Sequence, residues 1–372
     1  MLSPSNRRAP TVSSRCGPVA TWRQLSFLGQ GRACGVSSLS DGVCVEPPTL
    51  LDSSAHHGHM PPRQPLPPTL LARPFTVSRA RSEGVSVGRL RGADLAAPFR
   101  GVRVKRERAA LLSELCAAYK QTMTEGQFFS HETAARIWAA PLARSFVPSD
   151  GIHVSSTAPV RAPRAQGVHG HQASGSRVAI VVRHGMPVAD PASVWLQLAA
   201  AGSLSLDELV VVADHLVLVP EIPDHADPRP FVTLDELRAR ATEYSGRGAR
   251  RARAALAHVR VGSESRQETT LRLAIVAAGL PEPELNVVLY NAAGKRLGRA
   301  DKVYRRWRVI VEYDGQQHRT DSRQYDRDVT RTEEFIRDGW FPVKIRKQQM
   351  AFGAAEAVRR VERALRDKGW RP

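Results

Sequence analysis

The chain begins with a long stretch in which apolar residues follow no period. Residues 1–68 show neither the alternation of a strand nor the 3.6-residue spacing of a helix, and the run MPPRQPLPP closes them. Ser, Pro, Gly and Arg dominate this stretch, and such a composition buries too little apolar surface to offset the entropy of ordering. We expect a disordered tail here, or a start codon placed too far upstream, with Met60 as the true start.

Residues 69–150 predict a helical, helix-turn-helix-like domain. The caps, the turn and the basic residues that indicate two short helices are Thr76 or Ser78, Gly84, Ser86, Arg89 and Arg91. Residues 98–104 can form the strand of a wing. Arg89 and Arg91 are then candidates for DNA contact. The alternative is two short packing helices with no DNA role.

Residues 151–260 predict a mixed α+β region. Apolar and polar residues alternate at first, as in strands, and a helix then opens at Asp190 with Pro191 at its first position. An Arg-rich helical connector, residues 233–260, ends the region. Its Arg250 and Arg251 are expected to contact a DNA backbone, and a solvated helix face is the alternative.

Four histidines in this region raise the question of a metal site. They are His153, His169, His171 and His184. They lie on separate predicted strands and loops, and no two have the i, i+4 spacing that places two ligands on one helix face. The sequence therefore favours no metal ion here.

Residues 261–372 carry acids at the end of an apolar strand. A helix containing Glu268 is followed by a predicted strand at 284–290, by Asp301, and by the buried run RVIVEYDG. Because side chains alternate along a strand, Glu312 and Asp314 share one face with Ile310. On the helix that follows, a buried stripe is expected at Tyr325, Val329 and Ile336.

Clustered carboxylates repel one another unless a cation compensates them. Mg²⁺, or Mn²⁺, is the natural compensator because it takes oxygen ligands. The alternative is a structural network in which Arg299, Arg306 or Arg308 pairs with the acids.

Charge and composition narrow the choice of partner. The formal charge is +18 and the isoelectric point is near 10.7, which favours a polyanion, DNA. The four cysteines follow no C-x-x-C spacing, which fits a reduced cytoplasm, and no apolar run is long enough to span a membrane. We expect no small-molecule cofactor, and the oligomeric state stays open.

Six ordered blocks in the last domain resemble a known family. They are E-T-T-L-R (268–272), A-G-L-P (278–281), G-R-A-D (298–301), V-E-Y-D-G-Q-Q-H-R (311–319), Y-D-R-D-V-T-R (325–331) and G-W (339–340). Together they are similar to the bacterial family catalogued as domain of unknown function 559, which is related to very-short-patch-repair endonucleases of the PD-(D/E)XK superfamily. The N-terminal region resembles an antitoxin-like winged helix.

The resemblance implies a restriction-endonuclease-like mixed sheet flanked by helices and a site for phosphodiester hydrolysis. Asp301 would be the principal metal ligand, Glu312 the second carboxylate, and Glu268 a ligand through water. His318 would be the base for the attacking water and would follow the strand together with Asp314, and Arg331 would touch the scissile phosphate. Arg299 is a further candidate for DNA binding.

One position departs from the superfamily pattern. Its Lys two residues after the second acid is here Asp314, so the charge that would stabilise the attacking hydroxide is missing from its usual place. The resemblance still favours an α/β protein that is a metal-dependent DNA endonuclease, acting in DNA repair or defence. The alternative is a catalytically inactive, antitoxin-like DNA-binding regulator.

Overall fold

Capping side chains open most of the longer helices. The structure is a computed structural model that describes residues 64–173, 178–315 and 322–372, with the backbone alone for 322–328. The side chains of Asp190, Ser205, Thr233 and Ser265 each accept a hydrogen bond from the backbone N–H three residues later and so cap a helix. The α/β class is confirmed by eleven α-helices and three sheets in the described ranges. The predictions for residues 1–63, including the start at Met60, lie outside these ranges.

A small antiparallel sheet organises the N-terminal region, with strand order β1-β3-β2. Its elements are α1 (Pro68–Leu71), β1 (Phe75–Thr76), α2 (Val77–Ser82), the 3-10 turn η1 (Arg89–Arg91), β2 (Leu95–Ala96), β3 (Val102–Lys105) and a second 3-10 turn, η2 (Arg106–Arg108). Leu66 is already buried, so packing begins before the predicted boundary at residue 68.

The prediction of a second helix after the turn, as in a helix-turn-helix, is wrong. Thr76 caps α2 as predicted, because its hydroxyl accepts from Arg79 N at 3.1 Å, and Gly84 makes the turn with a φ of +83°. The chain then forms only the three-residue η1, which Gly88 and Gly92 flank. Glycine at both ends weakens helix extension. No recognition helix forms at this place.

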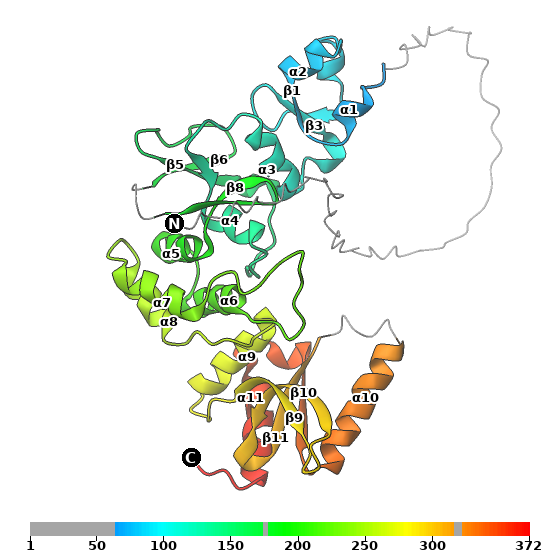
Figure 1. Cartoon of the computed structure of the whole chain (residues 1–372), viewed down its shortest axis with the longest axis vertical. Helices are drawn as coiled ribbons and strands as arrows, with labels where there is room; N and C mark the ends of the chain where they lie inside the picture. Colours follow the sequence, from blue (N-terminus) through cyan, green and yellow to red (C-terminus); the bar gives the residue numbers. More distant parts are fainter. Residues whose placement is uncertain (1–63, 174–177, 316–321) are drawn as a thin grey trace, which may run out of the picture. The chain divides into compact units, whose positions relative to one another are not determined.

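The middle region is built on a five-stranded mixed sheet with strand order β6-β5-β4-β8-β7. Figure 1 labels β5, β6 and β8 of this sheet. Its elements are α3 (Leu112–Lys120), β4 (Gln127–Phe129), α4 (His131–Ile137), η3 (Pro148–Asp150), β5 (Ile152–Thr157), β6 (Val168–Ala173), β7 (Ile180–Arg183), β8 (Met186–Ala189), α5 (Pro191–Ala201), α6 (Leu206–Val217), α7 (Leu234–Glu243) and α8 (Ala249–Leu256). One hydrophobic cluster, which includes Phe128 and Trp195, runs from Phe99 to Leu273 and takes in residues on both sides of position 150. The basic connector consists of two helices, α7 and α8.

The C-terminal sheet has the order β12-β11-β10-β9 and is mixed, because β11 and β12 are parallel while the other neighbours are antiparallel. Its elements are α9 (Arg266–Ala277), β9 (Glu284–Tyr290), β10 (Arg296–Tyr304), η5 (Arg305–Trp307), β11 (Val309–Asp314), α10 (Ser322–Arg337), β12 (Phe341–Arg346), η7 (Lys347–Met350), η8 (Phe352–Ala354) and α11 (Ala355–Asp367). The strand expected at 284–290 is confirmed.

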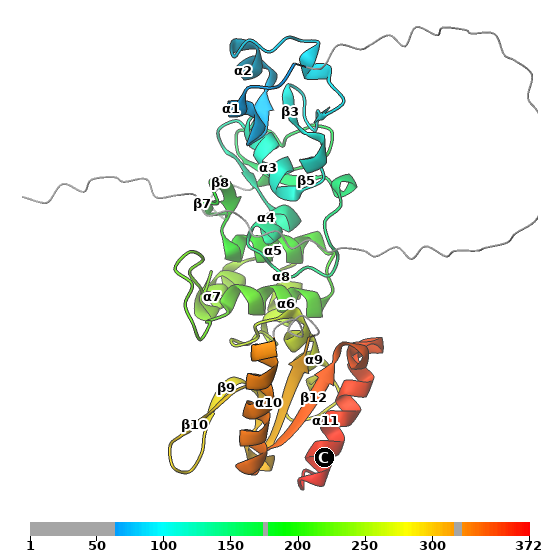
Figure 2. The same ribbon diagram turned by 90° about the vertical axis from the view of Figure 1, so that its right-hand side faces the viewer.

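The two faces of this sheet pack against different helices. Val309 and Val311 lie in a cluster with Leu271 of α9 and Val361 of α11, whereas Ile310 packs with Phe335 of α10. Figure 2 shows α10 and α11 on opposite sides of the strands. The alternation predicted for β11 is therefore confirmed.

The buried stripe predicted for α10 is wrong at the two positions whose side chains are described. Val329 and Ile336 are 37% and 56% exposed, whereas Phe335 is fully buried. Phe335 and Arg331 are four residues apart and share the inner face, since both side chains lie against Gly298 of β10. Within the described ranges, no helix has the length and apolar character needed to cross a membrane.

A buried ion pair joins α6 to α9. Asp214 and Arg272 have side chains only 1% exposed, and Arg272 Nη2 donates to Asp214 Oδ2 at 2.8 Å. Thr269 Oγ1 donates to the same oxygen, and the backbone N–H of Arg260 donates to Oδ1. Arg272 also donates to Glu282 at 3.2 Å. The carboxylate is thus satisfied by three donors from the segment that leads into the C-terminal sheet.

Asp214→Ala is expected to destabilise the protein by about 3–5 kcal/mol, because it leaves the Arg272 charge buried without this partner. Urea unfolding measures the loss. The matched control is Asp235→Ala, whose side chain is 93% exposed and pairs with Arg238 on the surface, and it should change stability by less than about 0.5 kcal/mol. Similar losses in both variants would show that the buried pair stabilises the protein no more than the surface pair does.

His215 in α6 should make stability fall in acid. Its Nε2–H donates to the carbonyl of Trp138 at 2.9 Å, and burial lowers its pKa from 6.5 to about 4. Between these two values the unfolded chain binds the proton and the folded chain does not, so the stabilisation is present above pH 6.5 and is lost as the pH falls toward 4.

The measurement compares the free energies of unfolding at pH 7 and near pH 4.5. The wild type should lose more stability on acidification than His215→Phe does, while the exposed control His258→Gln should lose as much as the wild type. Equal losses in wild type and His215→Phe would contradict this role.

Candidate functional site

Two acids on neighbouring strands lie at the same edge of the C-terminal sheet. Lys302 of β10 pairs with Val311 of β11, which places Asp301 beside Glu312. Asp301 Oδ2 accepts a hydrogen bond from the backbone N–H of Tyr313 at 2.9 Å, and Glu312 is buried with 7% of its surface exposed. The antiparallel pairing therefore brings together the two acids that the sequence placed eleven residues apart.

Glu268 approaches these acids from the first turn of α9. Its Oε1 accepts from Ser265 Oγ at 2.8 Å and its Oε2 accepts from the backbone N–H of Glu264 at 2.9 Å, so the start of the helix fixes the carboxylate. Burial raises the pKa of Glu268, and the nearby charge of Asp301 raises it further. Asp301 thus has Glu268 on one side and Glu312 on the other.

Positive side chains compensate this acidic edge. Lys302 is fully buried, and its Nζ has no hydrogen-bond partner within the described part of the chain. Burial lowers its pKa, whereas the charges of Asp301 and Glu268 oppose that shift. On the other face of the sheet, Arg331 Nη2 lies 3.3 Å from Glu312 Oε1. The structural alternative had Arg299, Arg306 or Arg308 pair with the acids. The charge of Asp301 acts on Arg299, and Lys302 and Arg331 are further positive side chains at this edge.

The acids do not form a closed cage for Mg²⁺ or Mn²⁺. In the described ranges, ligand atoms of His131, His153 and His171 lie within 4.8 Å of one another, and no set of three carboxylates does so. Glu268 is already engaged by donors from its own helix start, and Glu312 is paired with Arg331. The carboxylates as arranged here therefore do not fit a metal held by the protein alone.

The remaining predicted catalytic residues are Asp314, His318 and Arg331. Asp314 ends β11 on the same face as Glu312 and is half-buried. His318 lies outside the described residues. Arg331 reaches the sheet across Gly298, where a Cβ atom would lie only 2.8 Å from Arg331 Cδ. The absent side chain of Gly298 is what lets Arg331 lie against β10 and meet Glu312.

An open pocket of about 560 Å³ adjoins this edge, and it is lined by Glu221, Arg296, Leu297, Gly298, Arg299, Thr330, Arg331 and Glu334. Arg299 pairs with Glu264 at 2.6 Å and with Glu221 at 3.5 Å, and Arg296 pairs with Glu221 at 2.7 Å. Three guanidinium groups therefore face one pocket, and Arg331 connects that pocket with Glu312.

The other arginines predicted to bind DNA behave differently from one another. Arg89 makes two hydrogen bonds to Asp94, at 3.0 and 2.7 Å, and a third to the carbonyl of Gln64, so it holds the N-terminal fold and its side chain is only 10% exposed. Arg91 and Arg250 are exposed and Arg251 is half-buried. Arg250 and Arg251 line a second pocket on α8 together with Arg253. Local partners occupy the guanidinium of Arg89, and the DNA contact expected of it stays a prediction.

No family model, curated protein or solved structure matches this chain. The family resemblance in the last domain therefore stays a prediction that rests on the six sequence blocks and on the residues described above.

Sequence reasoning missed Arg296, Lys302 and His131. Arg296 lies three residues before Arg299 in one strand, and Lys302 directly follows Asp301. Their closeness in the sequence to predicted site residues could have indicated that they belong to the site. His131 is far from the other histidines along the chain, and only the pairing of β4 with β5 brings it to them.

Gly298→Ala should destabilise the C-terminal domain by about 1–3 kcal/mol, because the new Cβ would press on Arg331 and Phe335. Thermal or urea unfolding measures this loss. Gly294→Ala is the control: its φ of +78° is also unfavourable for alanine, but open space surrounds it, so its cost should be only about 1 kcal/mol. If the two glycines tolerate alanine equally, close packing at Gly298 is not what holds Arg331.

Proposed function

We propose that this protein is a DNA endonuclease and that the edge of the C-terminal sheet near Asp301 and Glu312 hydrolyses phosphodiester bonds. The observation that carries the proposal is the junction of an acidic edge with a pocket lined by Arg296, Arg299 and Arg331. Phosphate groups need positive charge for binding, and hydrolysis needs a group that orients and deprotonates water. Both kinds of group meet where Arg331 contacts Glu312.

Each charged group has a task that follows from its position. Arg296 and Arg299 are paired with acids at the pocket wall, and an incoming phosphate would compete with Glu221 for both of them. Glu312 is paired with Arg331, and Asp301 lies beside Glu312 on the neighbouring strand. At this position a carboxylate can accept a proton from water. Lys302 lowers the cost of holding Asp301 and Glu268 close together.

The family resemblance supports the same function. A mixed central sheet flanked by helices is the arrangement that it implies, and the C-terminal sheet is mixed, with α10 packed on one face and α9 and α11 on the other. The charge of +18 agrees with a DNA partner. Mg²⁺ or Mn²⁺ remains part of the proposal as a requirement to be tested with DNA present, because phosphate oxygens commonly complete the coordination of Mg²⁺.

A specific observation favours a second function, a DNA-binding regulator without catalysis. Asp314 stands where the superfamily has Lys, and Lys302 and Arg331 already neutralise the acids. In that case the pocket would dock DNA and the acidic edge would be structural. The two functions differ in cleavage and agree in binding.

Asp301→Asn is expected to abolish cleavage while DNA binding persists or tightens, because it removes negative charge beside the pocket. Supercoiled, mismatched and single-stranded DNA should be incubated with Mg²⁺, with Mn²⁺ and with chelator, and binding should be titrated in Ca²⁺ across a salt series. The log-log salt slope should be about 0.9 for each phosphate neutralised. The control is Glu356→Gln on α11, a half-exposed acid paired with Arg359, which should cut as the wild type does.

The results separate the two functions. If the wild type binds DNA and cuts none of these substrates with either metal, the regulator function is supported and the nuclease proposal fails. If Asp301→Asn cuts at the wild-type rate, Asp301 is not in the catalytic site. If the wild type does not bind DNA at low salt, both functions are wrong.

A further inference from the structure

Three histidines gather at one side of the middle sheet, away from the acidic edge. His153 lies on β5 and His171 on β6, and these strands pair in parallel with His153 opposite His169. Since His171 is two residues beyond His169, its side chain leaves the same face of the sheet. β4 pairs with β5 on the other side and runs directly into His131, the first residue of α4.

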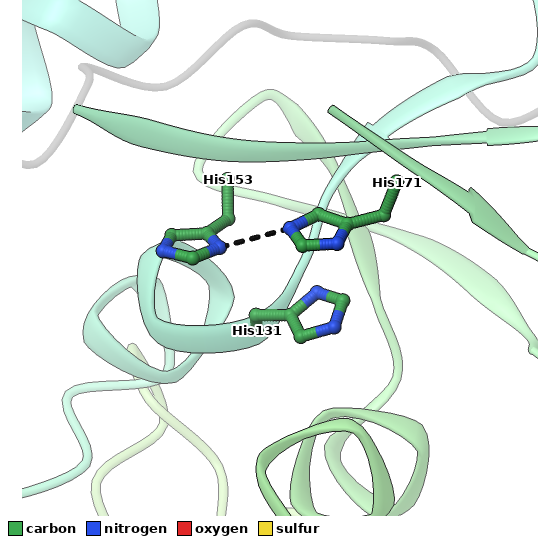
Figure 3. Close-up of side chains that lie close together, drawn as sticks. All are labelled: His131, His153 and His171. Carbon is green, nitrogen blue, oxygen red and sulfur yellow. Dashed lines mark hydrogen bonds between the residues drawn. The ribbon is translucent and has the colours of Figure 1, made fainter. Parts of the chain in front are cut away.

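The imidazoles are close enough to share one ion. Nitrogen atoms of His131, His153 and His171 all lie within 4.8 Å of one another. His153 Nδ1 and His171 Nε2 are 3.0 Å apart, and the ring of His131 stacks on that of His171 with centroids 3.8 Å apart (Figure 3). His169 stacks on His153 from outside the group, while its Nε2 contacts the carbonyl of Asp150 at 2.8 Å.

The surroundings keep these rings in the form that binds metals. A metal ligand must be a neutral imidazole. Burial lowers the pKa of His131 to about 3 and that of His153 to about 4, and it also lowers the pKa of His171.

The backbone of His131 is held in an unusual conformation. Its φ is +49°, a left-handed value that costs a non-glycine residue of the order of 1 kcal/mol. Its N–H donates to Gln197 Oε1 at 3.0 Å, and its ring Nδ1 lies 3.1 Å from Ser130 Oγ. These contacts direct the ring toward His171 instead of along α4, and a contact at Nδ1 leaves Nε2 available as a ligand.

A pocket of about 560 Å³, lined by both polar and apolar residues, opens beside two of these rings. His131 and His171 line it, as do Ser155, Gln172, Ser193, Gln197, Tyr244 and Arg247. A pocket of this kind gives an ion a route from solvent and leaves room for one more ligand.

We propose that His131, His153 and His171 bind one Zn²⁺ ion, with the fourth coordination position open toward this pocket. Three nitrogen ligands and one open position match the coordination of zinc sites that carry a water or a substrate. Tetrahedral zinc with Zn–N distances of about 2.0–2.1 Å places its ligand nitrogens about 3.3 Å apart. His153 and His171 need to separate by only a few tenths of an ångström, and His131 turns about its side-chain bonds.

The test uses the full-length protein purified without a metal-affinity tag and treated with chelator. The wild type should bind about one equivalent of Zn²⁺ through His131, His153 and His171. Zn²⁺ should also raise the unfolding temperature, because an ion that binds only the folded state stabilises it. His153→Ala and His171→Ala should each lose that equivalent and the thermal shift. The control His258→Ala, at an exposed position, should keep both.

Co²⁺ in place of Zn²⁺ gives a readout that needs no variant. X-ray absorption of the cobalt-loaded wild type should show three imidazole ligands, even if the alanine variants fail to fold. The proposal is overturned if the wild type takes up no Zn²⁺ at micromolar concentration, if folded His153→Ala and His171→Ala bind as the wild type does, or if the cobalt spectrum lacks imidazole. The histidine site is separate from Asp301. A protein that cleaves no DNA would contradict the proposed nuclease function and would not contradict the zinc proposal.

Discussion

The carboxylate of Asp214 carries its charge inside the core, and the segment that begins the C-terminal domain is arranged around it. Arg272 neutralises the charge, while Thr269 and the backbone N–H of Arg260 also donate hydrogen bonds to the carboxylate. A buried acid with fewer donors would be costly, so α9 has little freedom to rotate or slide on α6. The same helix carries Glu268, and its position therefore depends on this pair.

Charge balance also decides what the edge of the C-terminal sheet can do. Burial penalises the acids there, and Lys302 and Arg331 offset part of that penalty from opposite faces of the sheet. Arg331 also lines the pocket that contains Arg296 and Arg299. A phosphate that draws Arg331 away from Glu312 would free the carboxylate, which ties substrate binding to the chemistry proposed for this edge.

The two candidate sites use different donors and fit different ligands. The acids offer oxygen atoms, which are hard ligands, but as arranged they do not by themselves fit Mg²⁺ or Mn²⁺. The group of His131, His153 and His171 offers neutral nitrogen atoms, which suit zinc and related transition metals. Their sheets are different, so each site has its own geometry and its own test.

Local pattern determined the α/β class, the cap at Asp190, the strand Glu284–Tyr290 and the alternation that sets Glu312 apart from Val311, because each depends on neighbours a few residues away. The acids of the candidate site could be named from the sequence for the same reason. Contacts between distant segments decided the rest. The carbonyl of Gln64 accepts a hydrogen bond from Arg89, the absent side chain of Gly298 lets Arg331 and Phe335 of α10 pack against β10, and strand pairing brings His131 to His153 and His171. No periodicity encodes these contacts, since they arise only when separate elements pack against one another.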